Sequence, residues 1–201
     1  HITFETPMLF ALFFMGLFLI GGLTGLFLAA VGLDVHVHDT YFVVAHFHYV
    51  MVGGMMLAYL GGVHFWFPKM CGRMYPEFLG RIAALTIFIG FHVTFFPQFV
   101  MGYMGMPRHY HEYTSEFQVY HVLSTAGASV LGVGFLLPIV YLTYCWFFGP
   151  VVGSNPFKAT GLEWQTASPP PTTNFAEIPV VTVGPYEYVD FKEEDEVVHA
   201  R

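Results

Sequence analysis

Four long runs without a charged side chain are the feature that most constrains this sequence. They contain no Asp, Glu, Lys or Arg and cover residues 7–33, 40–68, 82–107 and 117–156. Each exceeds the ~20 apolar residues that an α-helix needs to cross a bilayer. None shows the short alternating segments of a membrane β-strand. The runs therefore predict four membrane-spanning helices, at about 7–33, 40–68, 82–107 and 117–149.

The predicted fold class is all-α: a polytopic transmembrane helical bundle followed by an irregular tail. Charged residues make up 10% of the chain, against about 25% in soluble domains. The first run lacks a basic segment before it and is too long for the apolar part of a signal peptide. Because the chain begins at His1, directly before the first helix, we expect it to be a piece of a longer polypeptide.

Loop charges predict the orientation of the bundle in the membrane. The middle loop carries Lys69, Arg73 and Arg81 against one acid, whereas the other two loops hold more acids than bases. Cytoplasmic loops are enriched in Lys and Arg, so this loop and both ends of the chain are predicted to be cytoplasmic. Residues 1–150 would form the membrane domain, and 151–201 a cytoplasmic tail that is rich in proline and then acidic.

Small residues four positions apart occur in two of the runs. Gly21 and Gly25 form one such pair, and Ser124, Ala128 and Gly132 form a ladder of the same spacing. Such spacing lets helices or cofactors approach closely in a membrane.

Two histidines, His46 and His48, lie two positions apart in the second run, within "VVAHFHYVM". Two residues subtend about 200° in an α-helix, so these side chains point to opposite faces and cannot share one small ion. Both could simply be buried and hydrogen-bonded to neighbouring helices. Intramembrane ionisable residues are functional-site candidates, however, and imidazole is a common ligand of haem iron. Two flat cofactors on opposite sides of the helix, with Phe47 between their edges, would also account for two histidines that point to opposite faces.

The segment "HDTYFVVAHFHYVMVGG", residues 38–54, resembles the signature of the catalytic subunit of haem–copper terminal oxidases, the cytochrome c oxidase subunit I family. The resemblance continues through "GGLTGLFLA", "FWFPKMCGRMYPEFLGR", "VTFFPQ", "GMPRHY" and "LEWQTASPPPTTNF". It covers nearly the whole chain, which would supply the last four helices of the family's twelve-helix subunit.

The resemblance implies roles for the two histidines. His46 matches the axial ligand of the high-spin haem, where oxygen binds and is reduced, so it is the predicted catalytic residue. His48 matches one of two axial ligands of the low-spin haem, which passes electrons on.

The resemblance also implies binding residues in the outer loops. His38 and Asp39 match ligands of a magnesium ion. Arg108 matches an arginine that holds the haem propionates, and Asp34 matches a residue of the polar network above the haems. At the position of the family's second arginine this sequence has His109. On chemistry alone, the His–Asp pair could instead cap a helix, and Arg108 could be a surface arginine.

For the whole assembly, the resemblance implies a proton-pumping oxidoreductase and translocase of the bacterial inner (plasma) membrane that reduces O2 to water with electrons from cytochrome c. Its cofactors would be two haems, of type A, a copper ion (copper B) and magnesium. The copper ligands lie on earlier helices of the family, so activity would require the N-terminal part of subunit I. Further expected partners are a copper-bearing subunit II, subunit III, cytochrome c and membrane lipid, but no nucleic acid.

Other interpretations remain open at this point. A quinol oxidase or a nitric oxide reductase of the same superfamily would share the two haem histidines. From other classes, a bis-histidine electron-transfer cytochrome or a metal transporter would also carry histidines in membrane helices. A transporter needs ligands that converge on one point, whereas His46 and His48 are predicted to diverge.

Overall fold

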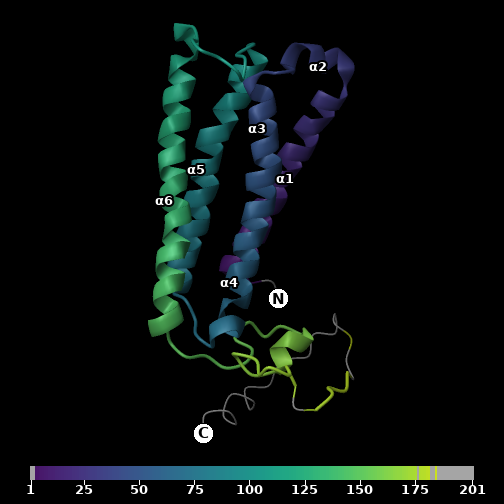
Figure 1. Ribbon diagram of the computed structural model, residues 1–201, viewed down its shortest axis with the longest axis vertical. Coiled ribbons are helices and arrows are strands. Elements are labelled where there is room, and N and C mark those ends of the chain that lie inside the picture. The colour runs from purple at the N-terminus through teal and green to yellow at the C-terminus, as the bar shows by residue number, and fades with distance from the viewer. Residues whose placement is uncertain (1–2, 176, 182–183, 185–201) are drawn as a thin grey trace.

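The computed structural model describes residues 3–175, 177–181 and 184, and these form a bundle of long helices with a folded tail at one end (Figure 1). Four helical stretches are long and apolar enough to cross a membrane: Thr6–Ala29, Tyr41–Cys71, Glu77–Tyr103 and Ser115–Phe148. Within the described ranges, β-structure is limited to isolated bridges. The predicted all-α, polytopic class is therefore confirmed.

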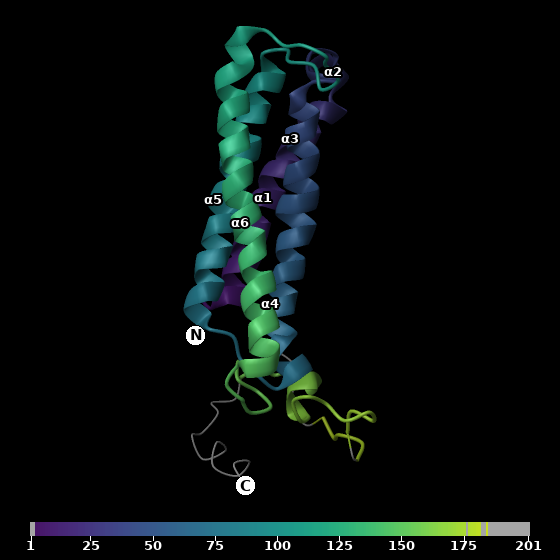
Figure 2. The same ribbon diagram turned by 60° about the vertical axis from the view of Figure 1, so that its left-hand side comes forward.

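The elements follow one another along the chain as α1 (Thr6–Ala29), α2 (Val31–Val37), α3 (Tyr41–Val50), a π-helix (Met51–Met56), α4 (Leu57–Cys71), α5 (Glu77–Tyr103), a 3₁₀ turn (Ser115–Phe117), α6 (Gln118–Phe148) and a 3₁₀ turn (Leu162–Gln165). Helix α5 packs on α6 on one side and on α3 on the other, while α1 packs on α3 and α4 (Figures 1 and 2). Helix α3 thus lies between α1 and α5.

The two ends of the bundle differ in what they hold. The start of α1, the α4–α5 turn and the tail lie at one end, and α2 with the α5–α6 loop lies at the other (Figure 1). The basic residues of the middle loop and the tail therefore share one end. We refer below to this as the tail end, and to the opposite one as the α2 end.

Some helix boundaries differ from the limits of the charge-free runs. Helix α1 ends at Ala29 because Ala30 takes an extended backbone (ψ 105°), and the chain then turns into α2, which carries Asp34 in its first turn. Helix α5 begins at Glu77, before its charge-free run, where Glu77 Oε1 accepts a hydrogen bond from Arg81 Nε at 2.9 Å. A run of apolar residues marks the part of a helix that suits hydrocarbon, whereas helices also extend into the interface.

Glycines allow the closest approaches between helices. A Cβ on Gly21 would lie 2.9 Å from Val50, and one on Gly25 would lie 2.9 Å from His46, so the predicted pair does face α3. Of the predicted ladder on α6, Ser124 is buried in the bundle, whereas Ala128 and Gly132 are exposed. A Cβ on Gly127 would meet Thr94 N at 2.5 Å, whereas Gly132 has nothing within 4 Å. Helix α6 is apolar on every side, so sequence spacing alone did not reveal which face meets α5.

The tail is anchored to the end of α4 by Lys69. Its Nζ donates to the carbonyl oxygens of Ser154 at 2.9 Å and Thr166 at 2.7 Å, and it lies 5.3 Å from the centre of the Trp164 ring. Trp164 is buried and packs edge-on against Phe65. The irregular tail thus has a defined docking site on the bundle. Its acidic run at 192–198 lies outside the described residues.

Candidate functional site

Helix α3 presents the two histidines, and its start is fixed by Thr40. The Thr40 hydroxyl oxygen accepts from Phe42 N at 3.2 Å and donates to the Val37 carbonyl at 2.6 Å. Such a side-chain cap satisfies one of the free N–H groups of the first turn. Thr40 is the N-cap, so the alternative that His38 or Asp39 caps this helix is wrong.

His46 faces α1. Its Nδ1 lies 2.9 Å from the carbonyl oxygen of Gly21 and 3.2 Å from Thr24 Oγ1. The ring fits there because Gly25 has no side chain. A carbonyl oxygen can only accept a hydrogen bond, so Nδ1 carries the ring proton and Nε2 keeps its lone pair. His46 is thus in the tautomer that binds a metal through Nε2.

His48 faces α5. Its ring stacks on Phe95 with centroids 4.2 Å apart and planes 18° apart, and its Nδ1 lies 2.8 Å from the carbonyl oxygen of Val44. The same reasoning places the proton on Nδ1 and the lone pair on Nε2. The predicted divergence of the two histidines is therefore confirmed, with one partner helix on each side of α3.

The arrangement fits two separate haem irons. A metal-bound histidine almost always donates its other ring N–H to a carbonyl or carboxylate, which fixes the ring and makes the ligating nitrogen more basic. Both His46 and His48 already have such a carbonyl partner. Phe47, between them in the sequence, stacks on His48 with centroids 4.5 Å apart.

A second set of predicted residues meets at the α2 end. Arg108 Nε lies 2.8 Å from Asp39 Oδ1, although the N–H does not point along the hydrogen-bond direction. The backbones are joined as well, because Arg108 N donates to the Asp39 carbonyl at 2.9 Å and Tyr41 N to that of Met106 at 3.0 Å. The fold thus ties the "HDTY" and "GMPRHY" segments together, and Arg108 has a specific acidic partner.

The remaining predicted residues lie apart from this contact. His38 Nδ1 is 3.9 Å from Asp34 Oδ2, and the His38 side chain is mostly exposed. His109 is exposed beside Arg108.

The two predicted magnesium ligands, His38 and Asp39, stay a prediction. No three His, Cys, Asp or Glu side chains gather at one point among the residues that the structure describes. Of the two predicted ligands, Asp39 is already paired with Arg108, and His38 with Asp34.

Sequence reasoning missed two features next to His48. The π-helix Met51–Met56 begins three residues after it, and such turns are frequent at functional sites. The glycine pair inside it, Gly53 and Gly54, was the available signal. In addition, the Tyr49 hydroxyl lies 2.8 Å from His92 Nδ1. No sequence pattern connects these two residues, which are 43 positions apart.

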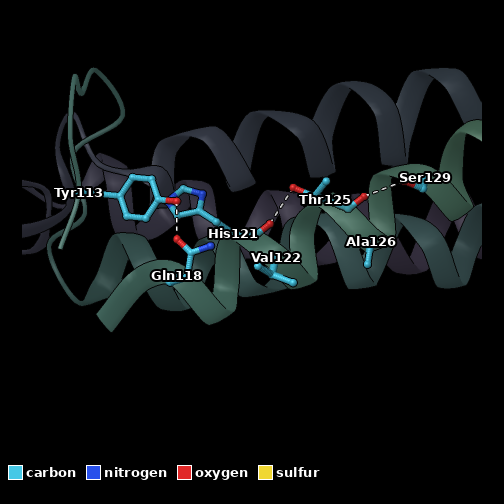
Figure 3. Close-up of a pocket in the computed structure, with 7 residues that line it drawn as sticks. All are labelled: Tyr113, Gln118, His121, Val122, Thr125, Ala126 and Ser129. Atoms are coloured by element: carbon cyan, nitrogen blue, oxygen red, sulfur yellow. Dashed lines mark hydrogen bonds between the residues drawn. The ribbon is translucent and has the colours of Figure 1, made fainter. Parts of the chain in front are cut away.

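A pocket of about 410 Å³ opens on the side of α6 near its start, lined by Tyr113, Gln118, His121, Val122, Thr125, Ala126 and Ser129 (Figure 3). The Tyr113 hydroxyl donates to Gln118 Oε1 at 2.7 Å across it. None of the predicted site residues lines this pocket, so it is separate from the two histidines.

Comparisons with known proteins show the family of this chain. Residues 1–130 match the family model described as "Cytochrome C and Quinol oxidase polypeptide I". The chain belongs to this family. The matched region contains α3 and both histidines as well as the Asp39–Arg108 contact.

Curated relatives are cytochrome c oxidase subunits 1. The Synechocystis protein is 49% identical over 93% of this chain and 34% of its own length. Those of Corynebacterium glutamicum and Bacillus subtilis are 45% and 42% identical over 89% and 90% of this chain, and over 31% and 30% of theirs. The chain thus spans about a third of the length of these relatives.

The fold also resembles a solved structure. A chain of a heme-copper terminal oxidase dimer aligns with a TM-score of 0.63 and 24% identity, covering 72% of this chain and 28% of that one. This likeness supports the arrangement of the helices in the bundle. The family and the four long apolar helices together indicate a piece of a multi-pass membrane protein.

Proposed function

We propose that this chain forms the last four membrane helices of the catalytic subunit of a terminal oxidase that reduces O2 to water with electrons from cytochrome c. The observation that carries the proposal is the divergence of His46 and His48, each with Nδ1 held by a backbone carbonyl and Nε2 available as a ligand. A single-haem electron carrier needs no such pair on one helix.

The two histidines take different roles in this proposal. His46 would hold the iron of the high-spin haem, which supplies the oxygen chemistry, and His48 would hold that of the low-spin haem. When bound, the haems supply the redox chemistry. The protein contributes ligation, spacing and orientation: the Gly21 carbonyl fixes the His46 ring, and Phe95 fixes the plane of the His48 ring.

Arg108 is proposed to hold haem propionates, because guanidinium groups suit paired carboxylates. Its contact with Asp39 would orient the guanidinium for this role. His109 and Asp34 would complete the polar surroundings at the α2 end. His38 and Asp39 are the proposed magnesium ligands, and Asp39 could bind the ion through Oδ2 while Oδ1 stays beside Arg108.

The rest of the proposed enzyme lies beyond this chain. The copper B ligands and the second low-spin haem ligand would come from the N-terminal part of the subunit. Electrons would arrive through a copper-bearing subunit II, and subunit III would complete a proton-pumping complex with haem A. We place it in the bacterial inner membrane. The three bases of the tail end, Lys69, Arg73 and Arg81, favour a cytoplasmic location for both ends of the chain.

A quinol donor is the second candidate, because the description of the matching family covers quinol oxidases as well. Oxygen consumption by the purified complex with reduced cytochrome c, and separately with a quinol, distinguishes the two donors. Turnover with cytochrome c alone supports the first candidate, and turnover with quinol alone replaces it.

An optical and resonance Raman spectrum of the reduced complex, before and after carbon monoxide, tests the assignment of the haems. We expect one six-coordinate low-spin haem that does not bind carbon monoxide and one haem that does. A complex with a single low-spin haem would contradict the proposal and favour an electron-transfer cytochrome.

A further inference from the structure

We propose that His92 is a positioning residue for His48: by holding the Tyr49 hydroxyl, it sets the orientation of the His48 ring toward its haem iron. This inference rests on the proposed function, in which His48 is a haem ligand. It concerns residues of this chain that neither the resemblance nor the comparisons assign to any role.

The Tyr49–His92 contact is buried between two helices. Tyr49 is 0% exposed, and its hydroxyl lies 2.8 Å from Nδ1 of His92, which is partly buried in α5. Within the described part of the chain, His92 is the polar partner that the structure gives this hydroxyl. A buried tyrosine hydroxyl normally requires such a partner, and inside a membrane no bulk water can replace it. The hydrogen bond therefore anchors α3 to α5 at one defined point.

On both helices, the residues of this hydrogen bond lie close to residues that fix His48. Tyr49 follows His48 directly on α3. On α5, Phe95 follows His92 by three positions, so both lie on the same face of that helix. His92 binds the Tyr49 hydroxyl while Phe95 stacks on the His48 ring. One face of α5 thus fixes both the backbone just after His48 and the plane of the His48 ring.

The backbone at this point needs an external restraint. The π-helix Met51–Met56 begins two residues after Tyr49, and Met51 N reaches both the His48 and the Phe47 carbonyls. A π-turn replaces the regular hydrogen bonds of an α-helix with a wider and rarer pattern. Rotation of α3 here would turn the His48 ring about its own helix. The ring contacts of Tyr49 with Phe91 and Phe99, with centroids 4.8 and 5.2 Å apart, oppose this rotation. The hydrogen bond to His92 is directional and therefore fixes one orientation.

The test uses the complete oxidase complex and five variants. His92→Phe removes the partner, Tyr49→Phe removes only the hydroxyl, and the double variant removes both. Tyr141→Phe is the matched control. It breaks a similar histidine–tyrosine contact, between His64 and Tyr141, that joins α4 to α6 instead of touching α3. The readouts are the electron paramagnetic resonance g-values and the midpoint potential of the low-spin haem, which respond to the orientation of its axial imidazole.

We expect His92→Phe and Tyr49→Phe to shift both readouts in the same direction, and the double variant to shift them no further than Tyr49→Phe does, because the residues act as one unit. Tyr141→Phe should leave the g-values and the midpoint potential at their wild-type values. His92→Gln can still hydrogen-bond the Tyr49 hydroxyl, so it should shift them less than His92→Phe does. If His92→Phe does not assemble, Tyr49→Phe alone decides.

If Tyr49→Phe contains both haems and keeps the wild-type g-values and midpoint potential, the positioning role is overturned and the proposed function stays intact. A wild-type complex that shows no low-spin haem would instead overturn the proposed function, and the inference with it.

Discussion

His46 and His48 are separated by one residue on α3, yet they contact different helices: Nδ1 of His46 lies 2.9 Å from the Gly21 carbonyl in α1, and the His48 ring stacks on Phe95 in α5 at 4.2 Å. A short H-x-H sequence therefore serves two sites instead of one. This explains how two histidines are retained in a membrane helix, since each ring has its own partner and the helix itself keeps them apart.

The close approach of α1 to His46 leads to the first prediction. A Cβ at Gly25 would lie 2.9 Å from His46 Cε1, so Gly25→Ala should displace the ring and reduce the amount of haem that binds carbon monoxide, with an overpacking cost of about 1–3 kcal/mol. Gly22→Ala on the same helix meets nothing within 4 Å and is the control. Carbon monoxide difference spectra measure the effect. Equal carbon monoxide difference spectra for Gly25→Ala and Gly22→Ala would contradict the close contact between Gly25 and His46.

Lys69 is predicted to hold the tail. Lys69→Met leaves the carbonyls of Ser154 and Thr166 without their charged donor. Hydrogen bonds to charged groups are worth about 1.5–3 kcal/mol each. We expect limited proteolysis within 151–175 to accelerate roughly tenfold or more, because cleavage follows the population of the opened tail. Lys158→Met, at an exposed position of the tail, should change the rate little. An unchanged rate for Lys69→Met would show that the remaining contacts hold the tail without Lys69.

Glu5, just before α1, is predicted to make stability depend on pH. Burial raises its pKa above the usual value, the Glu77 carboxylate adds to this, and Arg81 opposes it. Because the folded pKa lies above the unfolded one, ionisation of Glu5 disfavours the folded state, and stability falls as pH rises through the folded pKa.

Glu5→Gln should therefore raise the thermal unfolding midpoint of the complex at pH 8, by the equivalent of less than about 1 kcal/mol after solvent screening. The effect should fade as pH falls and be lost below about pH 3, where Glu5 is protonated in both the folded and the unfolded state. Glu112→Gln, at an exposed position of the α5–α6 loop, provides the comparison. A gain that is equal at both pH values would exclude ionisation as its cause.

The contact between α5 and α6 gives a packing prediction. Gly127→Ala would place its Cβ 2.5 Å from Thr94 N, a backbone atom that cannot move aside easily. We expect it to destabilise the complex by about 1–3 kcal/mol. Gly132→Ala, with nothing within 4 Å on the same helix, should be close to neutral. Denaturation in detergent, followed by helix signal, compares the two variants, and reversed effects would mean that α6 presents its other face to α5.

The helices and the divergent histidines could be predicted from the sequence, because both depend on local properties. Apolar length determines what spans a membrane, and the helical repeat alone separates His46 from His48. Features that depend on contacts between distant segments could not. A membrane helix is apolar on all sides, so nothing distinguished Gly127 from Gly132. The partners Asp39–Arg108 and Tyr49–His92 come from different helices or loops, and only the fold brings them together.

The most direct test of the account is to change each histidine separately in the complete complex, as His46→Ala and His48→Ala, and to record spectra with and without carbon monoxide. We predict that His46→Ala loses the haem that binds carbon monoxide and keeps the low-spin signal, whereas His48→Ala loses the low-spin signal and keeps a haem that binds carbon monoxide. Loss of the same haem in both variants would contradict the claim that the two histidines serve two different irons.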